Sequence, residues 1–337
     1  MGDKMGVFEN NGKLEVVTAK SAGYCFGVSQ AVGAAYEEAA KIAPDSGVKG
    51  DTDEIVPDAG RKGDTDHTEP EAGIKSERAD GNMPAVVTFG PIIHNEVVVE
   101  DLKRKGVGVV TNVDEIHGGT VIIRSHGVSK DIFDEITRRA DRVVDATCTF
   151  VKRIHEIVES QSREGKQIVI IGNHGHAEVE GTMGWCVKPC NKPIVIETHE
   201  EAEQFEADPG REICVVAQTT FHGTKFEELV AILRKKGYNV SVNNTICGAT
   251  RLRQTEARTI AQDADVMIVI GGKGSSNTAK LYEICKAECE RTFYVQTVDD
   301  LQLTLSENER KIGITAGAST PKNIIEEVQN NVRRTDF

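Results

Sequence analysis

Three cysteines stand at corners where an apolar run gives way to a segment typical of a helix. They are Cys25 in the string GYC, Cys148 in ATC and Cys247 in TIC. The apolar runs before them favour strands and cover residues 14–17, 142–144 and 238–242. A cysteine at the start of a helix meets unpaired N–H groups and the positive end of the helix dipole, which stabilise a thiolate. The sequence therefore predicts three thiolates directed at a shared centre.

Three converging thiolates suit two kinds of centre. One is a zinc ion with a histidine as its fourth ligand, and the other is an iron–sulfur cluster with one iron that has no protein ligand. Structural zinc sites usually contain two cysteines only two to four residues apart, and none of these three has such a neighbour. Widely separated cysteines fit a cluster held between domains better. Their recurrence argues against plain burial, the usual explanation of a single cysteine.

Loops rich in hydrogen-bond donors follow several apolar runs. Imidazoles, hydroxyls, an amide and nearby backbone N–H groups suit a phosphate or diphosphate, especially just before a helix. The residues are His94, Asn95, His126, Gly127, His176, Thr219, Thr220, Ser275, Ser276, Asn277, Ser319 and Thr320. Helix capping alone also explains Ser319-Thr320-Pro321 and Asn277-Thr278. The string GGKGSSN at 271–277 lacks the spacing of a Walker loop.

One acid stands among these donors. Glu178 follows His176 by two residues, so we expect it beside the shared centre, where burial would keep it able to deliver a proton. A glutamate that opens a helix is also a favourable partner of the helix dipole. His174 and Glu180 are expected at the surface or behind the site.

Strand-like runs alternate with amphipathic helical stretches from residue 85 onward. This alternation predicts an α/β protein with largely parallel sheets, in which ligands bind beyond the carboxyl ends of the strands. A first strand is expected at 14–20 and a helix at 26–43. The later strand-like runs are 85–89, 121–123, 168–171, 194–196, 213–216, 266–270, 293–295 and 311–314.

The three cysteines begin an internal repeat. Gly172 lies 24 residues after Cys148, and Gly271 lies 24 residues after Cys247. A second polar loop then begins at Gln218 and at Ala316, respectively. The first unit has the corresponding residues Cys25, Gly90 and Ser125, but the interval from its cysteine to its glycine is 41 residues longer. The sequence therefore predicts three related units, with boundaries at 26–147, 148–244, and 245–330 joined by the N-terminal strand 14–25.

The surplus of 41 residues is close to the length of an acidic segment at 44–83. It has few apolar side chains and repeats the string KGDTD at 49–53 and 62–66. Such a segment buries too little surface to fold on its own, so we interpret it as a surface insertion. A calcium loop is the alternative, but the glycine and closing glutamate that it needs are missing at the right offsets.

Composition sets further limits. The 337 residues, 39% of them hydrophobic, suffice for two or three domains, and the net charge of −13 argues against a general nucleic-acid or anionic-membrane surface. No apolar run approaches the roughly 18 residues of a membrane span, and the N-terminus lacks a signal-peptide pattern. We therefore expect a cytoplasmic protein, in which the eight cysteines do not form a disulfide framework.

The remaining cysteines form two further pairs and a single residue, Cys214. Cys186 and Cys190, like Cys285 and Cys289, are spaced C-x3-C, which is compatible with structural zinc. The second pair falls on a stretch typical of a buried helix face, which favours ordinary burial.

Nine strings together resemble one enzyme family. They are AGYCFGV, HNEVVVEDL, RSHGV, DATCTFVKR, GHAEVEGTMG, AQTT, NTICGATRLRQ, SSNT and TAGASTP, and they extend from Ala22 to Pro321. The sequence resembles the 4-hydroxy-3-methylbut-2-enyl diphosphate reductases, which catalyse the last step of the methylerythritol phosphate route to isoprenoids. The resemblance implies a trefoil of three α/β units around a 4Fe-4S cluster. Its ligands would be Cys25, Cys148 and Cys247, with one iron open to the substrate hydroxyl.

The resemblance also implies roles for the donors. Diphosphate ligands would be His94, His126, His176, Ser275, Asn277 and Ser319, with Thr220 and Ser276 at the border of that pocket. Glu178 would be the proton donor, with His176 beside it, and Thr219 the threonine near the substrate hydroxyl. The reaction would remove this hydroxyl with two electrons and protons, giving isopentenyl and dimethylallyl diphosphates.

Electrons would come from a ferredoxin or flavodoxin, because the sequence has no convincing nicotinamide or flavin fingerprint. Two features depart from the family pattern: Ala177 stands where proline is common, and the insertion 44–83 is unusual. The rival interpretations are a zinc hydrolase that uses Cys, His and Glu, and a non-catalytic sensor of diphosphate or of an iron–sulfur cluster.

Overall fold

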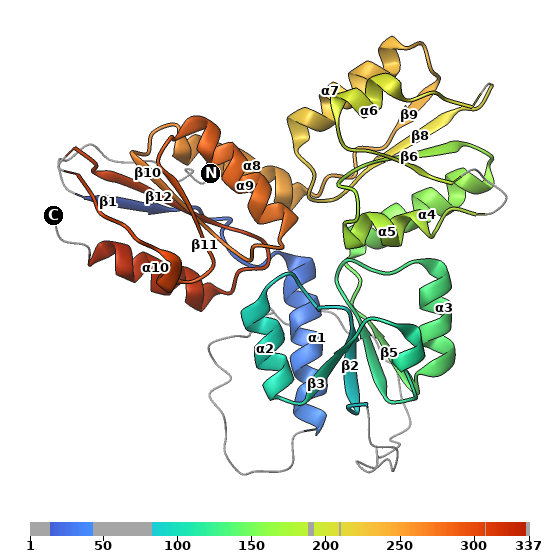
Figure 1. The fold of residues 1–337 in the computed structure, drawn as a ribbon, viewed down its shortest axis with the longest axis horizontal. Coiled ribbons are helices and arrows are strands. Elements are labelled where there is room, and N and C mark those ends of the chain that lie inside the picture. The colour runs from blue at the N-terminus through green and yellow to red at the C-terminus, as the bar shows by residue number, and fades with distance from the viewer. Residues whose placement is uncertain (1–13, 43–82, 188–191, 209, 307, 335–337) are drawn as a thin grey trace, which may run out of the picture.

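Three lobes radiate from a common centre in the computed structural model (Figure 1). The structure describes residues 14–42, 83–187, 192–208, 210–306 and 308–334. Each lobe contains one four-stranded sheet, and every strand pair in the three sheets is parallel. The predicted α/β class and trefoil are therefore confirmed.

The first sheet has the strand order β3-β2-β4-β5. Its strands are β2 (Val86–Phe89), β3 (Val107–Val110), β4 (Thr120–Ile123) and β5 (Arg142–Asp145). The helices of this part of the chain are α1 (Phe26–Ile42), α2 (Glu96–Arg104) and α3 (Lys130–Arg139), with a 3-10 turn η1 (Val113–Glu115). Asn95 caps α2 and Ser129 caps α3 by accepting backbone N–H bonds, which explains where these helices begin.

The second sheet repeats this order as β7-β6-β8-β9. Its strands are β6 (Gln167–Ile171), β7 (Ile194–Ile196), β8 (Ile213–Ala217) and β9 (Val240–Val242). Its helices are α4 (Thr149–Arg163), α5 (Ala177–Met183), α6 (His199–Gln204) and α7 (Gly223–Lys235). Both central strands are buried along their whole length, as their nearly continuous apolar sequences require. Their side chains alternate between two apolar clusters, one on each face of the sheet.

The third sheet has the order β11-β10-β12-β1, and the N-terminal strand completes it. Its strands are β10 (Val266–Ile270), β11 (Thr292–Val295), β12 (Lys311–Ala316) and β1 (Glu15–Thr18). Its helices are α8 (Gly248–Ala261), α9 (Ser276–Glu288) and α10 (Lys322–Arg333), with a 3-10 turn η2 (Val298–Asp300). The pairing of β1 with β12 joins the two ends of the described chain in one lobe.

Each cysteine corner is a crossing between lobes. The strand before it (β1, β5 or β9) is the edge strand of one sheet. The helix after it packs elsewhere: α1 joins the core beside β2, α4 contacts β6 and β8, and α8 contacts β12. The boundaries 26–147, 148–244 and 245–330 with 14–25 stay a prediction.

Several local predictions need correction. The first strand is shorter than expected, and β3 was missed because its sequence, VGVV, is short and interrupted by glycine. Ser319 and Thr320 do not cap α10, whose first turn has no side-chain cap. Ser275 caps α9, so Asn277 lies inside the helix. The insertion 44–83 lies outside the described residues except for Met83.

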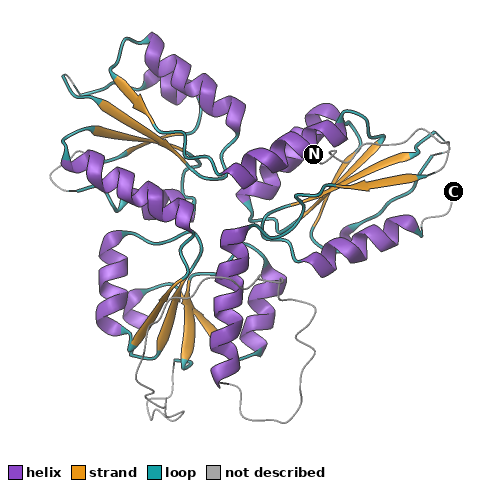
Figure 2. Cartoon of the chain, turned by 180° about the vertical axis from the view of Figure 1, so that it is seen from behind, coloured by secondary structure: helices purple, strands orange, loops and turns teal. Residues whose placement is uncertain are grey.

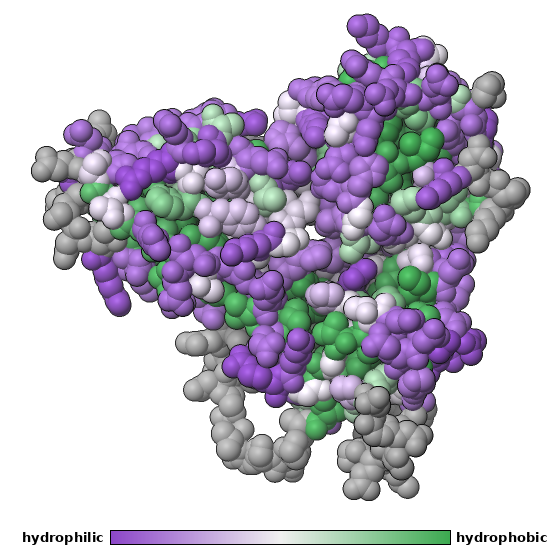
Figure 3. Space-filling view, viewed as in Figure 1, coloured by the Kyte–Doolittle hydropathy of each residue, from purple (hydrophilic) through white to green (hydrophobic). Residues whose placement is uncertain are grey.

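The surface of the lobes is mainly polar. Figure 3 shows hydrophilic side chains over most of the face turned to the viewer, with apolar groups between the elements of each lobe. None of the helices in the described part of the chain is long and apolar enough to cross a membrane.

Candidate functional site

The three cysteines lie around one pocket at the junction of the lobes. Cys148 and Cys247 are the N-cap residues of α4 and α8, and Cys25 directly precedes α1. The backbone N–H of Cys148 donates to the carbonyl of Ser125 at 3.0 Å, and that of Cys247 donates to Thr219 at 3.0 Å. Cys25 makes the equivalent bond to Ala318 at 3.4 Å. Each cysteine is thus tied to the loop that follows β4, β8 or β12.

Close packing brings the lobes together at these cysteines. A Cβ atom at Gly27 would lie 2.5 Å from Cys148 Sγ, so only glycine lets the first turn of α1 approach this sulfur. The loop before Cys25 is held by Glu256 of α8, which accepts the N–H groups of Lys20 and Ser21, both at 2.9 Å. The sulfur positions therefore depend on contacts between elements far apart in the sequence.

A buried arginine accompanies the thiols. Arg253 on α8 donates to the carbonyl of Gly23 at 2.5 Å, and its Nε is buried without a partner. Burial lowers the pKa of Arg253, and the nearby Cys25 and Cys247 act in the opposite direction. A cation here favours negative charge on the sulfurs and on anything they hold.

The expected thiolate is not favoured at Cys148 by the protein alone. Burial raises the pKa of this thiol, as do Cys25 and Cys247, while N–H groups of Phe150 and Val151 lower it. The helix N-terminus is therefore outweighed by desolvation. A bound metal reverses this balance, because metal ligation selects the thiolate.

The donor set fits an iron–sulfur cluster with three cysteine ligands. The pocket has about 720 Å³ of space free of atoms, part of which is open solvent. Soft sulfur donors line it together with imidazoles, hydroxyls and an amide. A cluster and a small polar ligand can thus share the pocket.

Three histidines form the polar part. The ring centroids of His94 and His126 are 4.5 Å apart, and His176 lies 5.7 and 5.6 Å from them, respectively. His94 Nε2 and His126 Nδ1 are buried without a hydrogen-bond partner. His176 Nδ1 accepts the N–H of Glu178 at 3.1 Å, so in the neutral ring Nε2 carries the proton and can donate.

All three rings are held neutral. Burial lowers the pKa of His94, and it lowers the pKa of His176 to about 4. The pKa of His126, which is also buried, is lowered well below its usual value. His94 and His176 also lower the pKa of His126, and His94 lowers that of His176. Nitrogen atoms of the three rings lie within 4.8 Å of one another, so they have the geometry to hold a metal ion as well as an anion.

The third lobe adds an unsatisfied amide. Asn277 is 4% exposed, and both its Oδ1 and its Nδ2 are buried without a partner. Such a group is costly to bury unless a ligand completes its hydrogen bonds. Ser319 Oγ donates to the carbonyl of His94 at 3.2 Å, and Asn95 Nδ2 donates to the carbonyl of Ser319 at 2.9 Å. These bonds fix the loop of the third lobe against that of the first.

Glu178 lines the same pocket as the cysteines and the polar groups. It is 2% exposed, and its oxygens accept the N–H and the hydroxyl of Thr219, both at 2.6 Å. Burial raises the pKa of Glu178 to about 7, although the two bonds from Thr219 act in the opposite direction. Near neutral pH this carboxyl is therefore protonated in a large part of the molecules.

Ser276 and Thr220 belong to a network at the border of the pocket. Thr220 Oγ1 donates to Ser276 Oγ at 3.2 Å, and Ser276 Oγ donates to Asn173 Oδ1 at 3.3 Å. Gln218 Nε2 donates to both hydroxyls, at 2.8 and 3.3 Å. The three cysteines, Glu178 and most of the predicted donors line this pocket, but Asn95, Gly127 and Thr320 do not. Ser276 and Thr220 mainly bond to each other and to these amides.

Neither Arg253 nor Arg124 was predicted from the sequence as a residue of the site. Arg124 is partly buried, and its Nε has no hydrogen-bond partner. Gly90, at φ 71°, makes room for it, because a Cβ there would lie 2.2 Å from Nη1 of Arg124. Its charge lowers the pKa of His94, His126 and His176. Arg124 lies within the string RSHGV and Arg253 within NTICGATRLRQ, and this membership in the family strings is the signal that could have found them.

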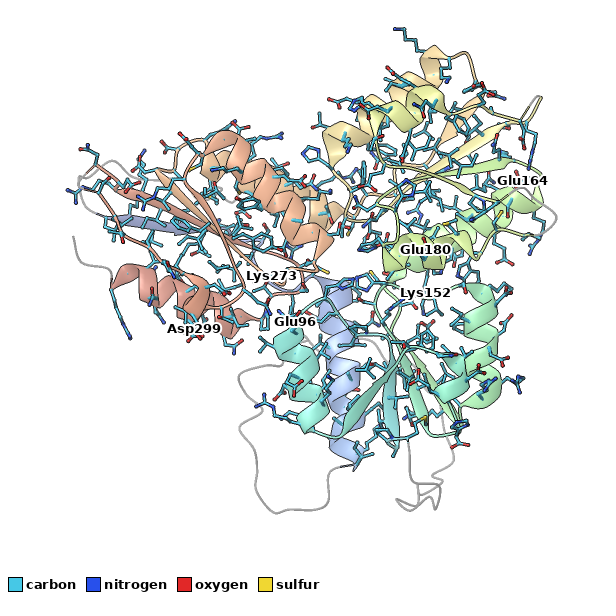
Figure 4. All side chains as sticks on the ribbon, viewed as in Figure 1. Glu96, Lys152, Glu164, Glu180, Lys273 and Asp299 are labelled. Carbon is cyan, nitrogen blue, oxygen red and sulfur yellow. The ribbon has the colours of Figure 1, made fainter. Side chains whose placement is uncertain are left out.

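Other residues named from the sequence lie away from the chemistry. His174 is exposed and its Nε2 contacts Glu201 at 2.8 Å, and Glu180 is exposed. In Figure 4, Glu180 and Lys152 lie near the junction of the lobes, whereas Glu164 lies at the outer end of the same lobe. Three further cysteines, Cys214, Cys285 and Cys289, are buried in apolar clusters, and Cys190 lies outside the described residues.

A family model described as "LytB protein" matches residues 72–333. A 4-hydroxy-3-methylbut-2-enyl diphosphate reductase of Alkaliphilus oremlandii is 37% identical over 320 residues, which cover 95% of this chain and 99% of the relative. The chain belongs to the LytB family. A relative of the same name from Clostridioides difficile is 37% identical and covers 94% of this chain and 98% of its own.

Two solved structures resemble this LytB family chain. The E-1-hydroxy-2-methyl-but-2-enyl-4-diphosphate reductase of Plasmodium falciparum matches with a TM-score of 0.78 and 23% identity, over 96% of this chain and 90% of its own. That likeness supports the fold. An (E)-4-hydroxy-3-methyl-but-2-enyl diphosphate reductase, described as the terminal enzyme of the non-mevalonate pathway, matches at 36% identity with a TM-score of 0.59. It covers 96% of this chain and the whole of its own.

Proposed function

We propose that this chain is a 4-hydroxy-3-methylbut-2-enyl diphosphate reductase. It would take up two electrons and two protons, release the allylic hydroxyl as water, and form isopentenyl and dimethylallyl diphosphates. The observation that carries this proposal is a buried carboxyl, Glu178, with a pKa of about 7, in one pocket with three thiols and a neutral cage of hydrogen-bond donors. Its relatives at 35–37% identity carry this name.

The donor cage would bind the diphosphate. The proposed ligands are His94, His126, His176, Ser275, Asn277 and Ser319, with Thr220 and Ser276 at the border. An anion would satisfy the orphaned amide of Asn277 and accept from the protonated Nε2 of His176. Arg124 would supply the full positive charge that the neutral rings lack.

Cys25, Cys148 and Cys247 would hold a 4Fe-4S cluster. When bound, the cluster would supply electrons singly and a Lewis-acidic iron without a protein ligand. Arg253 would offset its negative charge, since this guanidinium interacts with Cys25 and Cys247. Electrons would arrive from a ferredoxin or flavodoxin.

Glu178 would give its proton to the departing oxygen, which leaves as water. Thr219 would hold the carboxyl in place through its two 2.6 Å bonds, with its hydroxyl beside the reacting end of the substrate. His176 positions the same acid from the other side by accepting its backbone N–H. The burial that raises the pKa of Glu178 also excludes water from the proton transfer.

Anaerobic purification provides the test. We expect brown protein with about four iron and four sulfide per chain, and product formation with reduced methyl viologen. Zinc is the second candidate, because the three imidazoles have metal-binding geometry. Colourless protein that contains stoichiometric zinc, and that is inactive after cluster reconstitution, would contradict the reductase.

A further inference from the structure

Four large apolar side chains are well exposed in the described part of the chain. Phe26 is 69% exposed, Leu252 57%, Phe150 45% and Val97 39%. The three most exposed follow the three cysteines at short distance, by one residue at Phe26, two at Phe150 and five at Leu252. Each lies in the first turns of the helix that its cysteine opens.

The three helix starts that carry these side chains border the pocket that contains the cysteines. Gly27 and Val28 line this pocket beside Phe26, and Phe150 lines it directly. Thr250 and Arg253 line it on both sides of Leu252. The helices come from all three lobes, and Figure 2 shows long helices of each lobe with their ends directed at the centre of the molecule. We call Phe26, Phe150 and Leu252 the apolar triad.

The triad takes no part in the core of its own helices. The buried positions of α1 begin with Gly27 and Ala31, and those of α4 with Val151 and Ile154. On α8 the buried neighbours of Leu252 are polar, Thr250 and Arg253. Large apolar side chains that stay exposed beside a site are typical of a contact surface for another molecule.

The charges beside the triad differ in sign from those of the whole protein. Arg153 on α4 and Arg251 on α8 are exposed next to Phe150 and Leu252. Lys152 is half-exposed and pairs with Asp145 at 2.6 Å. Two exposed acids lie in the same region, Glu156 a turn farther along α4 and Glu180, which Figure 4 shows near Lys152. A local basic rim on a chain of net charge −13 selects an acidic partner at this place.

We infer that the apolar triad, with Arg153 and Arg251, is the docking surface for an acidic one-electron carrier protein of the ferredoxin or flavodoxin type. This inference rests on the proposed function, which needs electrons delivered at the three cysteines. Electron transfer requires close approach, and this surface lies beside the pocket that contains those cysteines. A small apolar patch with a charged rim suits a weak, short-lived complex, which steering by charge makes fast.

The test uses the iron-loaded enzyme and avoids the residues nearest the cysteines. The variants are Leu252→Ser and the double variant Arg153→Glu with Arg251→Glu. Matched controls are Val97→Ser, which removes the exposed apolar side chain outside the triad, and Arg234→Glu in the last turn of α7. Binding is measured by titrating the enzyme into oxidised flavodoxin and following flavin fluorescence. Turnover is measured with reduced flavodoxin and, separately, with reduced methyl viologen.

We expect the dissociation constant and the KM for flavodoxin to rise about tenfold in Leu252→Ser, and more in the double arginine variant. Added salt should weaken wild-type binding and have less effect on the double variant. Iron content and viologen-driven turnover should stay within about twofold of wild type. The controls should match wild type.

Unchanged flavodoxin binding and KM in both variants, with viologen turnover intact, would refute the docking surface alone. An equal loss of flavodoxin binding in the Val97→Ser and Arg234→Glu controls would also refute it, because the effect would then not be specific to the apolar triad and its arginines. Absence of viologen-driven turnover in iron-loaded wild-type enzyme would instead refute the proposed function. The two failures are therefore distinguishable.

Discussion

At the scale of single residues, Glu178 combines two opposing influences. Burial raises its pKa to about 7, while the N–H and hydroxyl of Thr219 stabilise the ionised form. The result is a carboxyl that is poised to give up a proton near neutral pH but is held in one orientation. A glutamate with ordinary solvent exposure would already have lost its proton.

Glu178→Gln should abolish proton delivery and leave binding intact. Gln can keep one bond from Thr219 and is similar in shape, so diphosphate affinity should change less than about threefold. Viologen-driven turnover should fall by about a hundredfold or more. Undiminished turnover would reject Glu178 as the acid, and Glu180→Gln on the exposed face of α5 is the control.

The same carboxyl predicts a pH dependence of stability. Its pKa is about 7 in the folded chain against an ordinary value of 4.5, so protonation favours the folded state. This contribution is complete below the ordinary value and is lost as the pH rises through 7. Relative to Glu178→Gln, which does not titrate, the metal-free wild type should lose about 1–3 kcal/mol of unfolding free energy between pH 5 and pH 8. Urea unfolding of both proteins measures this difference, and a constant difference would contradict it.

The three neutral histidines predict that diphosphate binding takes up protons. Burial keeps the pKa values of His94, His126 and His176 low, and a bound anion raises them. Affinity should therefore fall as the pH rises from 6 to 8. Calorimetry in two buffers of different ionisation enthalpy counts the protons. The His126→Asn variant should take up fewer protons than wild type when it binds diphosphate. The titration of diphosphate itself is common to both proteins, so equal proton uptake would show that His126 is not a group that becomes protonated.

At the scale of secondary-structure elements, the starts of α1, α4 and α8 set the cysteine geometry. The backbone N–H of each cysteine donates to a carbonyl in the loop that follows β4, β8 or β12. At Gly27, α1 comes close to the sulfur of Cys148. Small residues at such contacts determine how closely two lobes can meet. The start of α4 therefore serves mainly to place the sulfur of Cys148, since its N–H groups and dipole do not offset the rise in thiol pKa that burial causes.

Gly27→Ala tests this close contact. Its Cβ would lie 2.5 Å from Cys148 Sγ, so α1 or the cysteine must move. We expect about 1–3 kcal/mol lower stability of the metal-free protein and reduced iron retention after reconstitution. Gly33→Ala is the control in the same helix, because it meets nothing within 4 Å and alanine favours a helix. Equal iron retention in both variants would show that the contact is unimportant.

At the scale of the whole molecule, one chain closes on itself around a centre that no single lobe contains. Each of the edge strands β1, β5 and β9 leads from one lobe to the first helix of another lobe. Because β1, the N-terminal strand, belongs to the last sheet, the chain closes on itself. A ligand held by one cysteine from each corner would therefore link all three lobes. The same arrangement gathers the apolar triad, one side chain from each corner.

Removal of iron should loosen this linkage. Because each lobe keeps its own sheet and core, secondary structure should persist after chelation. We expect a melting temperature lower by several degrees and faster proteolysis of the loops between lobes. Circular dichroism and timed digestion of loaded and chelated protein measure both effects. Identical digestion would show that the lobes are held together by protein contacts alone.

Sequence by itself determined the local parts of this protein. The apolar strand runs, the polar loops after them and the recurring cysteines follow from short-range patterns, and the repeat predicted that Gly90, Gly172 and Gly271 occupy equivalent places. They do: each directly follows a central strand, β2, β6 or β10. Short or interrupted strands such as β3 were not predicted, because four residues that include a glycine give too weak an apolar pattern.

Only the tertiary structure decided what depends on contacts between lobes. The orphaned amide of Asn277, the placement of Arg124 over Gly90 and the burial that raises the pKas of Glu178 and Cys148 all depend on neighbours remote in sequence. The exposure of the apolar triad is of the same kind. Desolvation and packing are properties of the assembled surroundings, so no local pattern of residues encodes them.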